Sequence, residues 1–313
     1  MYKNNSYRPS PRRKKPNYKK RFYFMCGIAL FLCLLLFVGL YRNYNYIVFK
    51  HLISGHYIYT ETLDGLYQNA IDKTPENNYF KNFDEVVISI VTEKIRETAG
   101  DRYTYLYTPV QFENEKAYTK ENAEQSEIIV LSDDTVYLRL TNISNYTRKL
   151  IYDSRTLLNG YSNIVIDLRG NNGGSVSELY KISDLFLDHQ AIIGSEIARH
   201  EIFSTVAKAR RERYFDFENI FLLQDSRTAS AAEGFIVALR ENLENVQIVG
   251  TQSFGKGIGQ ITLPIKSGFA VKATFIKILT PQNNSIHEEG ITPDILCEDE
   301  DALEHVKKLL QID

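Results

Sequence analysis

The feature that most constrains this chain is an apolar run of 20 uncharged residues, 22–41, with the sequence FYFMCGIALFLCLLLFVGLY. At a rise of about 1.5 Å per residue, a helix of this length spans about 30 Å, the hydrocarbon thickness of a bilayer. A cleaved signal peptide usually has a shorter apolar stretch that ends in small residues, whereas this run continues directly into Arg42. We therefore expect one transmembrane anchor, with a cleaved signal as the alternative.

The charges before this run predict its orientation. Residues 1–21 contain nine Lys and Arg and no acidic residue, and the whole chain has 37 basic and 39 acidic residues. The remainder therefore has 28 basic and 39 acidic residues, a net charge of −11. We expect residues 1–21 to be a basic cytoplasmic tail and residues 42–313 to lie outside the cell membrane. A body this acidic repels phosphate backbones, so we expect no nucleic acid partner.

The cysteines and the residue spacing argue against a disulfide framework, a cysteine nucleophile and a metal site in the outer part of the chain. Cys26 and Cys33 lie within the apolar run, so Cys297 is the only cysteine beyond it and no disulfide can form there. No neighbour of Cys297 would favour its thiolate, which argues against a cysteine nucleophile. No cluster of His, Cys and Asp has the spacing of metal ligands, so we expect neither a metal nor a cofactor.

The outer part of the chain changes pattern near residue 135. We expect residues 42–134 to be mostly helical, beginning with short helices that lead away from the membrane. A longer helix is expected to end near residues 99–100, with Asn82 as its cap and one apolar face formed by Phe83, Val86, Val87 and Ile90. A polar, Glu-rich link is expected after Pro109, up to about residue 135.

Residues 135–313 alternate between strand and helix patterns, which predicts an α/β architecture. Residues 135–140 alternate like a half-buried strand, and the apolar runs 164–166, 220–223 and 246–249 suit strands covered on both faces. Helical periodicity occurs between them, at 176–187 and 231–243. Residues 261–279 have the pattern of a hairpin around residues 266–268.

Two segments place glycines or small residues directly after an apolar run. Residues 167–174 (DLRGNNGG) either hold an anion with outward backbone N–H groups or simply form a strand-to-helix turn. In residues 225–233 (DSRTASAAE), Ser230 precedes Glu233 by three positions, which is typical of a helix capping box. Ser230 is therefore either a cap alone or a nucleophile whose helix start stabilises developing negative charge.

A third segment, residues 250–260 (GTQSFGKGIGQ), has two interpretations. It begins like a phosphate-binding loop, but Gly257 stands where Ser or Thr must bind Mg²⁺, and a strand pattern follows in place of a helix, so we expect no nucleotide. Alternatively, burial would bring the pKa of Lys256 from about 10.4 toward the 7–8 that a base needs near neutrality. Lys256 is then a base for Ser230 if the two meet in space, and otherwise a surface lysine.

Taken together and in this order, the segments resemble the carboxyl-terminal processing (tail-specific) serine proteases of peptidase family S41. The similar stretches are 164–174 (IVIDLRGNNGG), 228–233 (TASAAE), 249–260 (VGTQSFGKGIGQ) and 278–295 (ILTPQNNSIHEEGITPDI). Residues 101–112 (DRYTYLYTPVQF) are similar to the segment that precedes the family's PDZ domain. The resemblance covers roughly residues 80–297.

The resemblance implies a crotonase/ClpP-like α/β core over residues 135–313, a helical N-terminal region and a protein or peptide substrate. It implies a Ser–Lys dyad of Ser230 and Lys256, with Gln260 helping to position the lysine amine. The oxyanion hole would use the backbone amide of Ala231 and a glycine amide of the upstream loop. That glycine is Gly173 or Gly174.

Two features depart from the family. Only 26 residues (110–135) separate Pro109 from Val136, whereas a domain needs at least about 50, so we expect this variant to lack the PDZ domain and the tail recognition that it provides. Ala232 stands where many members have a second serine, which is not the nucleophile.

We therefore expect a membrane-anchored serine endopeptidase of the bacterial cell envelope that cleaves proteins through an acyl-enzyme. The alternative is a catalytically silent peptide-binding scaffold with the same fold. A third interpretation is a Ser–His hydrolase that uses His287, in the loop of residues 284–288.

Overall fold

The computed structural model describes residues 18–59, 85–298 and 301–312, and the chain divides into two units, Met1–Tyr44 and Asn45–Asp313. In the first unit, helix α1 (Tyr18–Arg42) has 25 residues and is long and apolar enough to cross a membrane. This confirms a helix over the predicted run 22–41. Its length and composition suit a membrane anchor and a signal sequence alike. Residues 1–17 of the predicted tail lie outside the described residues.

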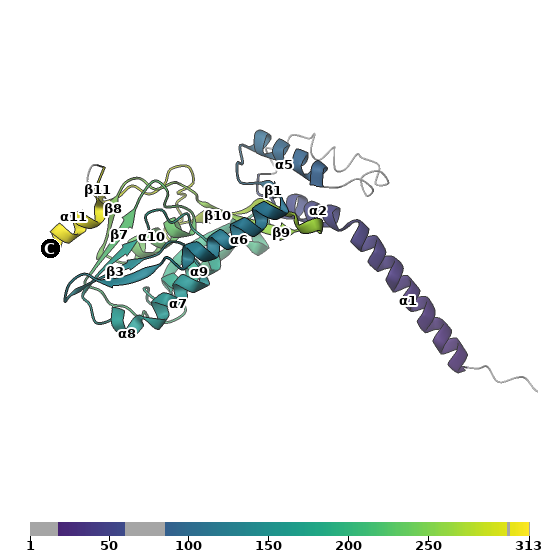
Figure 1. Ribbon diagram of the computed structural model, residues 1–313, viewed down its shortest axis with the longest axis horizontal. Helices are drawn as coiled ribbons and strands as arrows, with labels where there is room; N and C mark the ends of the chain where they lie inside the picture. Colours follow the sequence, from purple (N-terminus) through teal and green to yellow (C-terminus); the bar gives the residue numbers. More distant parts are fainter. Residues whose placement is uncertain (1–17, 60–84, 299–300, 313) are drawn as a thin grey trace, which may run out of the picture. The chain divides into compact units, whose positions relative to one another are not determined.

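The second unit contains a six-stranded sheet with the strand order β11-β8-β7-β4-β3-β2. Figure 1 labels four of its strands, β3, β7, β8 and β11. Five strands are parallel: β3 (Thr135–Arg139), β4 (Asn163–Asp167), β7 (Asn219–Gln224), β8 (Val246–Gly250) and β11 (Ile295–Leu296). The edge strand β2 (Glu127–Val130) is antiparallel to β3. All four predicted strand runs are thus confirmed, and so is the α/β class.

Both faces of this sheet are covered. On one face, Leu138, Ile166 and Leu222 pack with four helices, α7 (Asn145–Asp153), α8 (Arg155–Leu158), α9 (Val176–Ser183) and α10 (Ala231–Asn242). On the other face, Tyr137 and Val165 pack with α11 (Ala302–Leu309). The prediction of a half-buried strand at 135–140 is therefore wrong, because α11, from the far end of the chain, covers the second face.

A smaller antiparallel sheet has the order β1-β10-β5-β6, with β9 also paired to β10. The hairpin predicted for residues 261–279 is confirmed as β9 (Ile258–Pro264), the short helix η2 (Lys266–Gly268) and β10 (Ala270–Leu279). The other strands are β1 (Tyr105–Tyr107), β5 (Ile192–Ala198) and β6 (Thr205–Lys208), and η1 (Glu201–Phe203) joins β5 to β6.

Helices α2 (Tyr44–His56) and α5 (Glu85–Ala99) pack with this hairpin in a separate hydrophobic cluster. The end of α5 confirms the predicted helix, whereas its predicted cap, Asn82, lies outside the described residues together with Phe83. The predicted apolar face is wrong for Val86 and Ile90, which are exposed. The buried positions are Ile88, Thr92 and Ile95. The helix has two overlapping apolar stripes, and its contacts with α2 and the hairpin determine which of them is buried.

The polar link predicted after Pro109 is also wrong, because this segment forms helix α6 (Pro109–Ala123) and strand β2. Thr108 and Gln111 form a capping box at its start, with Pro109 in the first turn. α6 buries only Ala123, so the sequence has no apolar stripe that would predict this helix. Strands β1 and β2 precede residue 135 but pair with β10 and β3.

Candidate active site

A cavity of about 920 Å³ is lined by α6, by the loops that follow β4 and β7, and by strands β9 and β10. The carboxyl ends of the parallel strands β4 and β7 lie at one edge of the sheet, so loops far apart in sequence meet there. The cavity brings together five of the six predicted site residues: Gly173, Gly174, Ser230, Lys256 and Gln260. The sixth, Ala231, is fully buried directly after Ser230.

Ser230 precedes α10 in a backbone conformation that non-glycine residues rarely adopt, with φ 58° and ψ −121°. Its N–H donates to the Glu233 carboxylate at 2.7 Å, and its carbonyl accepts the Gly234 N–H at 2.9 Å. The flanking residues Ala229 and Ala231 are buried, whereas Ser230 is half-buried and lines the cavity. A strained residue fixed by its surroundings is a frequent feature of functional sites.

The glycine loop, residues 168–174 after β4, packs directly against Ser230. Gly173 has φ 103°, and a side chain there would come within 2.8 Å of the Ser230 Cβ and 3.0 Å of the Ala231 nitrogen. Gly174 has φ 148°, and a side chain there would collide with the Ile143 carbonyl. Both positions therefore require glycine, one for close approach to Ser230 and the other for close approach to the neighbouring backbone.

The two glycines differ in what their N–H groups bind. The Gly173 N–H donates to the Asn171 side-chain oxygen at 2.9 Å. Among the hydrogen bonds of residues 85–298, none uses the N–H of Gly174 or of Ala231. The Ala231 N–H lies at the start of α10, where the helix dipole favours negative charge. Of the three amides predicted for the oxyanion hole, those of Ala231 and Gly174 are thus unoccupied in these residues, whereas that of Gly173 is not.

Lys256 reaches the same cavity from the loop before β9 and is half-buried. Its burial and, secondly, the positive charge of Lys272 lower the pKa of Lys256 to about 8, although the Glu115 and Glu233 carboxylates act in the opposite direction. Lys272 lines the cavity from β10, where its amine lies 3.3 Å from the Tyr107 hydroxyl. At pH 7 about a tenth of Lys256 side chains is therefore uncharged, far more than for an ordinary lysine.

The Lys256 amine lies over the Tyr103 ring, 4.8 Å from its centroid. Within the described part of the chain, the Lys256 amine forms no ion pair. It also forms no hydrogen bond with the Ser230 hydroxyl there. The structure thus brings Ser230 and Lys256 to one cavity without joining their reactive atoms.

Sequence reasoning missed the full role of Glu233, which is completely buried. Its carboxylate accepts four hydrogen bonds, from the N–H groups of Ser230 (2.7 Å), Gly255 (2.7 Å) and Lys256 (2.8 Å) and from the Ser253 hydroxyl (2.6 Å). One side chain thus ties the backbone of Ser230 to that of Lys256. The capping-box spacing signalled Glu233, but it could not show that a second loop binds the same oxygens.

Gln260 lines the cavity from β9, but it forms no hydrogen bond with Lys256 in the described residues. Its side-chain nitrogen is buried without a hydrogen-bond partner there. Its role in positioning the Lys256 amine stays a prediction.

His287 does not line the cavity. Its Nε2 lies 3.5 Å from the Tyr59 hydroxyl, and its backbone lies against Gly257. The geometry therefore gives no support to a Ser–His pair with Ser230.

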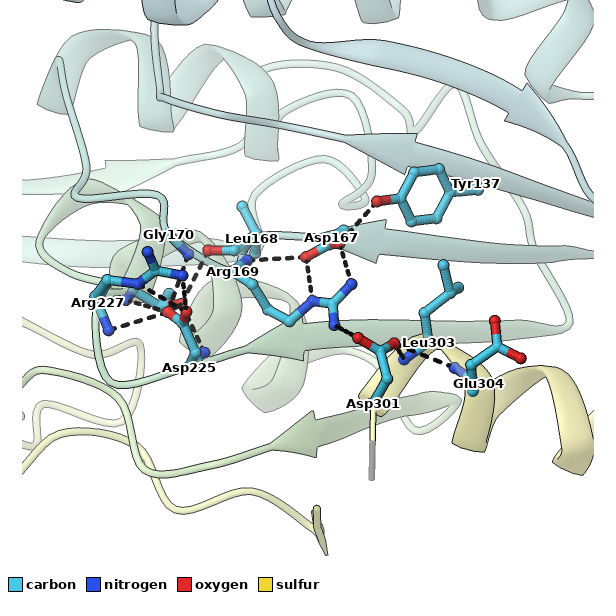
Figure 2. Close-up of polar contacts among 11 residues, drawn as sticks. Tyr137, Asp167, Leu168, Arg169, Gly170, Asp225, Arg227, Asp301, Leu303 and Glu304 are labelled. Atoms are coloured by element: carbon cyan, nitrogen blue, oxygen red, sulfur yellow. Dashed lines mark hydrogen bonds and ion pairs between the residues drawn. The ribbon is translucent and has the colours of Figure 1, made fainter. Parts of the chain in front are cut away.

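The start of the glycine loop is held by two Asp–Arg pairs (Figure 2). Asp167 accepts the Tyr137 hydroxyl at 2.7 Å and pairs with Arg169 at 2.7 Å. Arg169 also pairs with Asp301 at 2.8 Å. Because Asp301 caps α11 by accepting N–H groups of its first turn, this pair links the glycine loop to the C-terminal helix.

The second pair is formed by Asp225 and Arg227, 2.8 Å apart. Asp225 also accepts the Gly170 N–H at 2.9 Å (Figure 2). Burial alone would raise the pKa of Asp225, but the hydrogen bonds from Gly170 and Arg227 outweigh it and lower that pKa.

Within residues 18–59, 85–298 and 301–312, no group of three or more His, Cys, Asp or Glu side chains is placed to hold a metal ion. Strand β9 begins two residues after Lys256, where a phosphate-binding loop requires a helix. The phosphate-binding interpretation of this segment therefore lacks its helix.

Comparison with known proteins identifies the family. The family model described as peptidase family S41 matches residues 134–297, which is slightly more than half of the chain. The chain belongs to peptidase family S41. The carboxy-terminal processing protease CtpA of Bacillus subtilis is 35% identical over 166 residues, which cover 51% of this chain and 34% of that protein. The chain thus spans about a third of the length of this curated relative.

Two solved structures share the fold. A lipoprotein from Streptococcus agalactiae superposes with a TM-score of 0.64 at 15% identity, over 86% of this chain and 96% of that chain. The photosystem II D1 C-terminal processing protease has a TM-score of 0.50 at 22% identity, over 60% of this chain and 53% of that chain. These likenesses confirm the α/β fold that the sequence resemblance implied.

Proposed function

We propose that this chain is a serine endopeptidase that cleaves protein substrates through a Ser230–Lys256 dyad. The neutral Lys256 amine takes the proton of the Ser230 hydroxyl as its oxygen attacks the scissile carbonyl, and then passes that proton to the leaving amine. The N–H groups of Ala231 and Gly174 stabilise the oxyanion. Water, deprotonated by Lys256, then hydrolyses the acyl-enzyme and releases the Ser230 hydroxyl.

The observation that carries this proposal is the Glu233 carboxylate, which binds the N–H groups of both Ser230 and Lys256. It fixes the two backbones at one cavity, so the reaction requires only a side-chain movement. The Lys256 amine must leave the Tyr103 ring and turn toward the Ser230 hydroxyl, which its flexible four-carbon stem allows. Catalytic hydrogen bonds commonly form only when substrate is bound.

The segment between β1 and β3 supports a variant substrate site. The resemblance places a PDZ domain here in other members, whereas in this chain the segment forms α6 and β2. The α6 side chains of Glu115, Tyr118 and Asn122 line the cavity. We infer that α6 takes part in substrate selection in the place of a PDZ domain.

We propose further that α1 anchors the chain in the cell membrane of a bacterium in a single pass. The nine basic residues within 1–21 would keep the N terminus in the cytoplasm and leave the peptidase unit outside it.

The test is labelling of the full chain with a serine-directed fluorophosphonate, together with turnover of an unstructured protein substrate. Ser230→Ala should abolish both, and Lys256→Ala should lower turnover by about 10²–10⁴-fold. The matched control is Ser226→Ala, since Ser226 lines the same cavity and should be dispensable. Equal labelling of the wild type and Ser230→Ala would overturn the proposal. Peptide binding without turnover by the wild type would instead support the silent scaffold.

A further inference from the structure

An exposed patch of apolar and basic side chains lies on β5, η1 and β6, at the edge of the smaller sheet. The most exposed apolar side chain is that of Ile202, at 85%. We define the hairpin patch as the apolar residues Ile197, Ile202, Phe203 and Val206 with the basic residues Arg199, Lys208 and Lys277, all of which are exposed.

Strand register places the strand residues of the patch on the face of the sheet opposite the cavity. Ile197 lies directly across from Lys277 on β10, and Val206 lies across from Ser195, two residues before Ile197. These side chains therefore share one face of the sheet. Glu196 projects to the other face, where it lines the cavity. A partner bound to the hairpin patch would leave the cavity open to substrate.

The charge of the hairpin patch is opposite to that of the rest of the outer chain. Three cations border the apolar side chains, and Glu201 of η1 is the one carboxylate of the joining turn. Residues 22–313, in contrast, have 28 basic and 39 acidic residues. Exposed apolar side chains bordered by Lys and Arg suit the surface of an anionic bilayer, where the apolar groups enter the lipid and the cations meet phosphate headgroups.

The patch is also tied to the part of the chain that follows the apolar helix. Arg199 donates to the Ser54 carbonyl of α2, and the Phe203 ring lies 5.4 Å from the His56 ring. α2 begins at Tyr44, two positions after the last residue of α1, and its 13 residues span about 20 Å. The α2 residues that contact the patch, Ser54 and His56, therefore follow the last residue of α1 by only 12 and 14 positions along the chain.

We infer that the hairpin patch binds the surface of an anionic lipid bilayer. A second copy of the chain is a poorer occupant, because a two-fold interface would bring the same three cations together. Lipid binding gives the anchored unit one preferred orientation, with the cavity face turned away from the membrane.

The chain contains no tryptophan, so Ile202→Trp places a single fluorescent reporter in the patch. The full chain carrying this change would be reconstituted into phosphatidylcholine vesicles with and without phosphatidylglycerol, each also prepared with brominated acyl chains. Side chains that bind at the interface enter about 5–10 Å, to the boundary of the acyl chains. We expect a blue shift of the emission and quenching by brominated lipid, both of which require phosphatidylglycerol.

Leu296→Trp is the matched control, since Leu296 is 61% exposed on β11 of the other sheet, and its emission should not respond to lipid. In the Ile202→Trp chain, Lys208→Gln and Lys277→Gln should each lower the ratio of docked to undocked protein about fivefold. Turnover of a soluble peptide should be unchanged in both, which separates this test from that of the Ser–Lys dyad.

Three results would overturn the inference. The first is equal quenching at positions 202 and 296, and the second is an emission at position 202 that does not depend on phosphatidylglycerol. The third is a blue shift that grows with protein concentration in detergent, which would assign the patch to a second copy of the chain.

Discussion

The two loops beside Ser230 are held by carboxylates in opposite ways. The loop of residues 253–256 is held by Glu233, which is fully buried and accepts only backbone N–H groups and one hydroxyl. The glycine loop is held by Asp167 and Asp225 through ion pairs with Arg169 and Arg227, whose side chains are 24% and 75% exposed. The first arrangement excludes water, whereas the second lies partly in it.

This difference determines which contacts water can replace. A buried N–H group that loses its acceptor costs about 1–3 kcal/mol, whereas an exposed ion pair contributes about 0–1 kcal/mol because water solvates both partners. The loop that carries Lys256 should therefore be strictly dependent on one carboxylate. The glycine loop should tolerate the loss of the Asp225–Arg227 pair, whose Arg227 side chain is 75% exposed, better than that of the Asp167–Arg169 pair, whose Asp167 side chain is only 4% exposed.

The largest expected effect is that of Glu233→Gln. The amide nitrogen of glutamine cannot accept a hydrogen bond, so two of the four donors that Glu233 serves would be left buried without an acceptor. We expect a loss of about 2–5 kcal/mol in the free energy of unfolding, measured by denaturant titration, and a loss of at least about tenfold in kcat.

Glu241→Gln is the matched control, because Glu241 lies on the same helix and accepts a single N–H, from Gln282 at 2.7 Å. Its side chain is partly exposed, so we expect a change of about 0.5 kcal/mol or less. Equal losses in the two variants would remove the distinction between the two loops.

Asp225→Asn should have a smaller effect. Asparagine keeps an oxygen for the Gly170 N–H but loses the ion pair with Arg227. We expect a decrease of about 2–4 °C in the melting temperature at pH 7, with KM unchanged.

The pH dependence of this difference has a definite sign. Because the folded state lowers the pKa of Asp225, its stabilisation is complete above the unfolded pKa of about 3.9 and is lost as the pH falls through the folded value. The wild type and Asp225→Asn should therefore converge in stability below about pH 4. A difference that persists unchanged down to pH 3 would show that the pair is not the origin of the effect.

Lys272→Met tests the effect of the Lys272 charge on the pKa of Lys256. Removing the Lys272 charge should raise the pKa of Lys256 above about 8, so less of the base is neutral at pH 7 and the pH–rate profile moves to higher pH. At pH 7 we expect kcat/KM to fall severalfold and to recover at higher pH. Lys277→Met, on the opposite face of the same strand, is the control and should leave the profile in place.

Much of the α/β core could be predicted because its local signals agree with its packing. The runs at 164–166 and 220–223 are apolar on both faces and are buried on both faces. The glycine loop, Ser230 and Lys256 each follow such a run, so strand order alone brings them to one edge. The ordered motifs then predicted six site residues, five of which line one cavity.

The failures have a common physical cause, which is that burial depends on partners distant in sequence. Val86 and Ile90 form a regular stripe, yet α2 and the hairpin cover the adjacent stripe. α6 has no stripe, because its position depends on its capping box and on the few contacts of its last turn. Glu233 looked like a local cap, because nothing in the spacing indicates that Gly255 and Lys256 bind the same carboxylate.

The smallest expected effect is that of Asp301→Asn, which tests the link between the glycine loop and α11. Asparagine caps a helix as well as aspartate does, so this change removes only the ion pair with Arg169, which keeps Asp167 as a partner. We expect a loss of about 0.5 kcal/mol in the free energy of unfolding and no change in kcat. Asp301→Ala also removes the cap and should lose about 1 kcal/mol more.

The two Asp301 variants therefore separate the cap from the ion pair. If Asp301→Asn lowered kcat as strongly as Glu233→Gln does, α11 would hold the glycine loop through a contact that water cannot replace. Exposure of the Arg169 side chain would then not predict that its ion pair can be lost without effect. Both loops would depend strictly on their carboxylates. If only Asp301→Ala lowers stability and kcat is unchanged in both, the ion pair is replaceable. The order of effects from Glu233 through Asp225 to Asp301 then follows how far each carboxylate is removed from water.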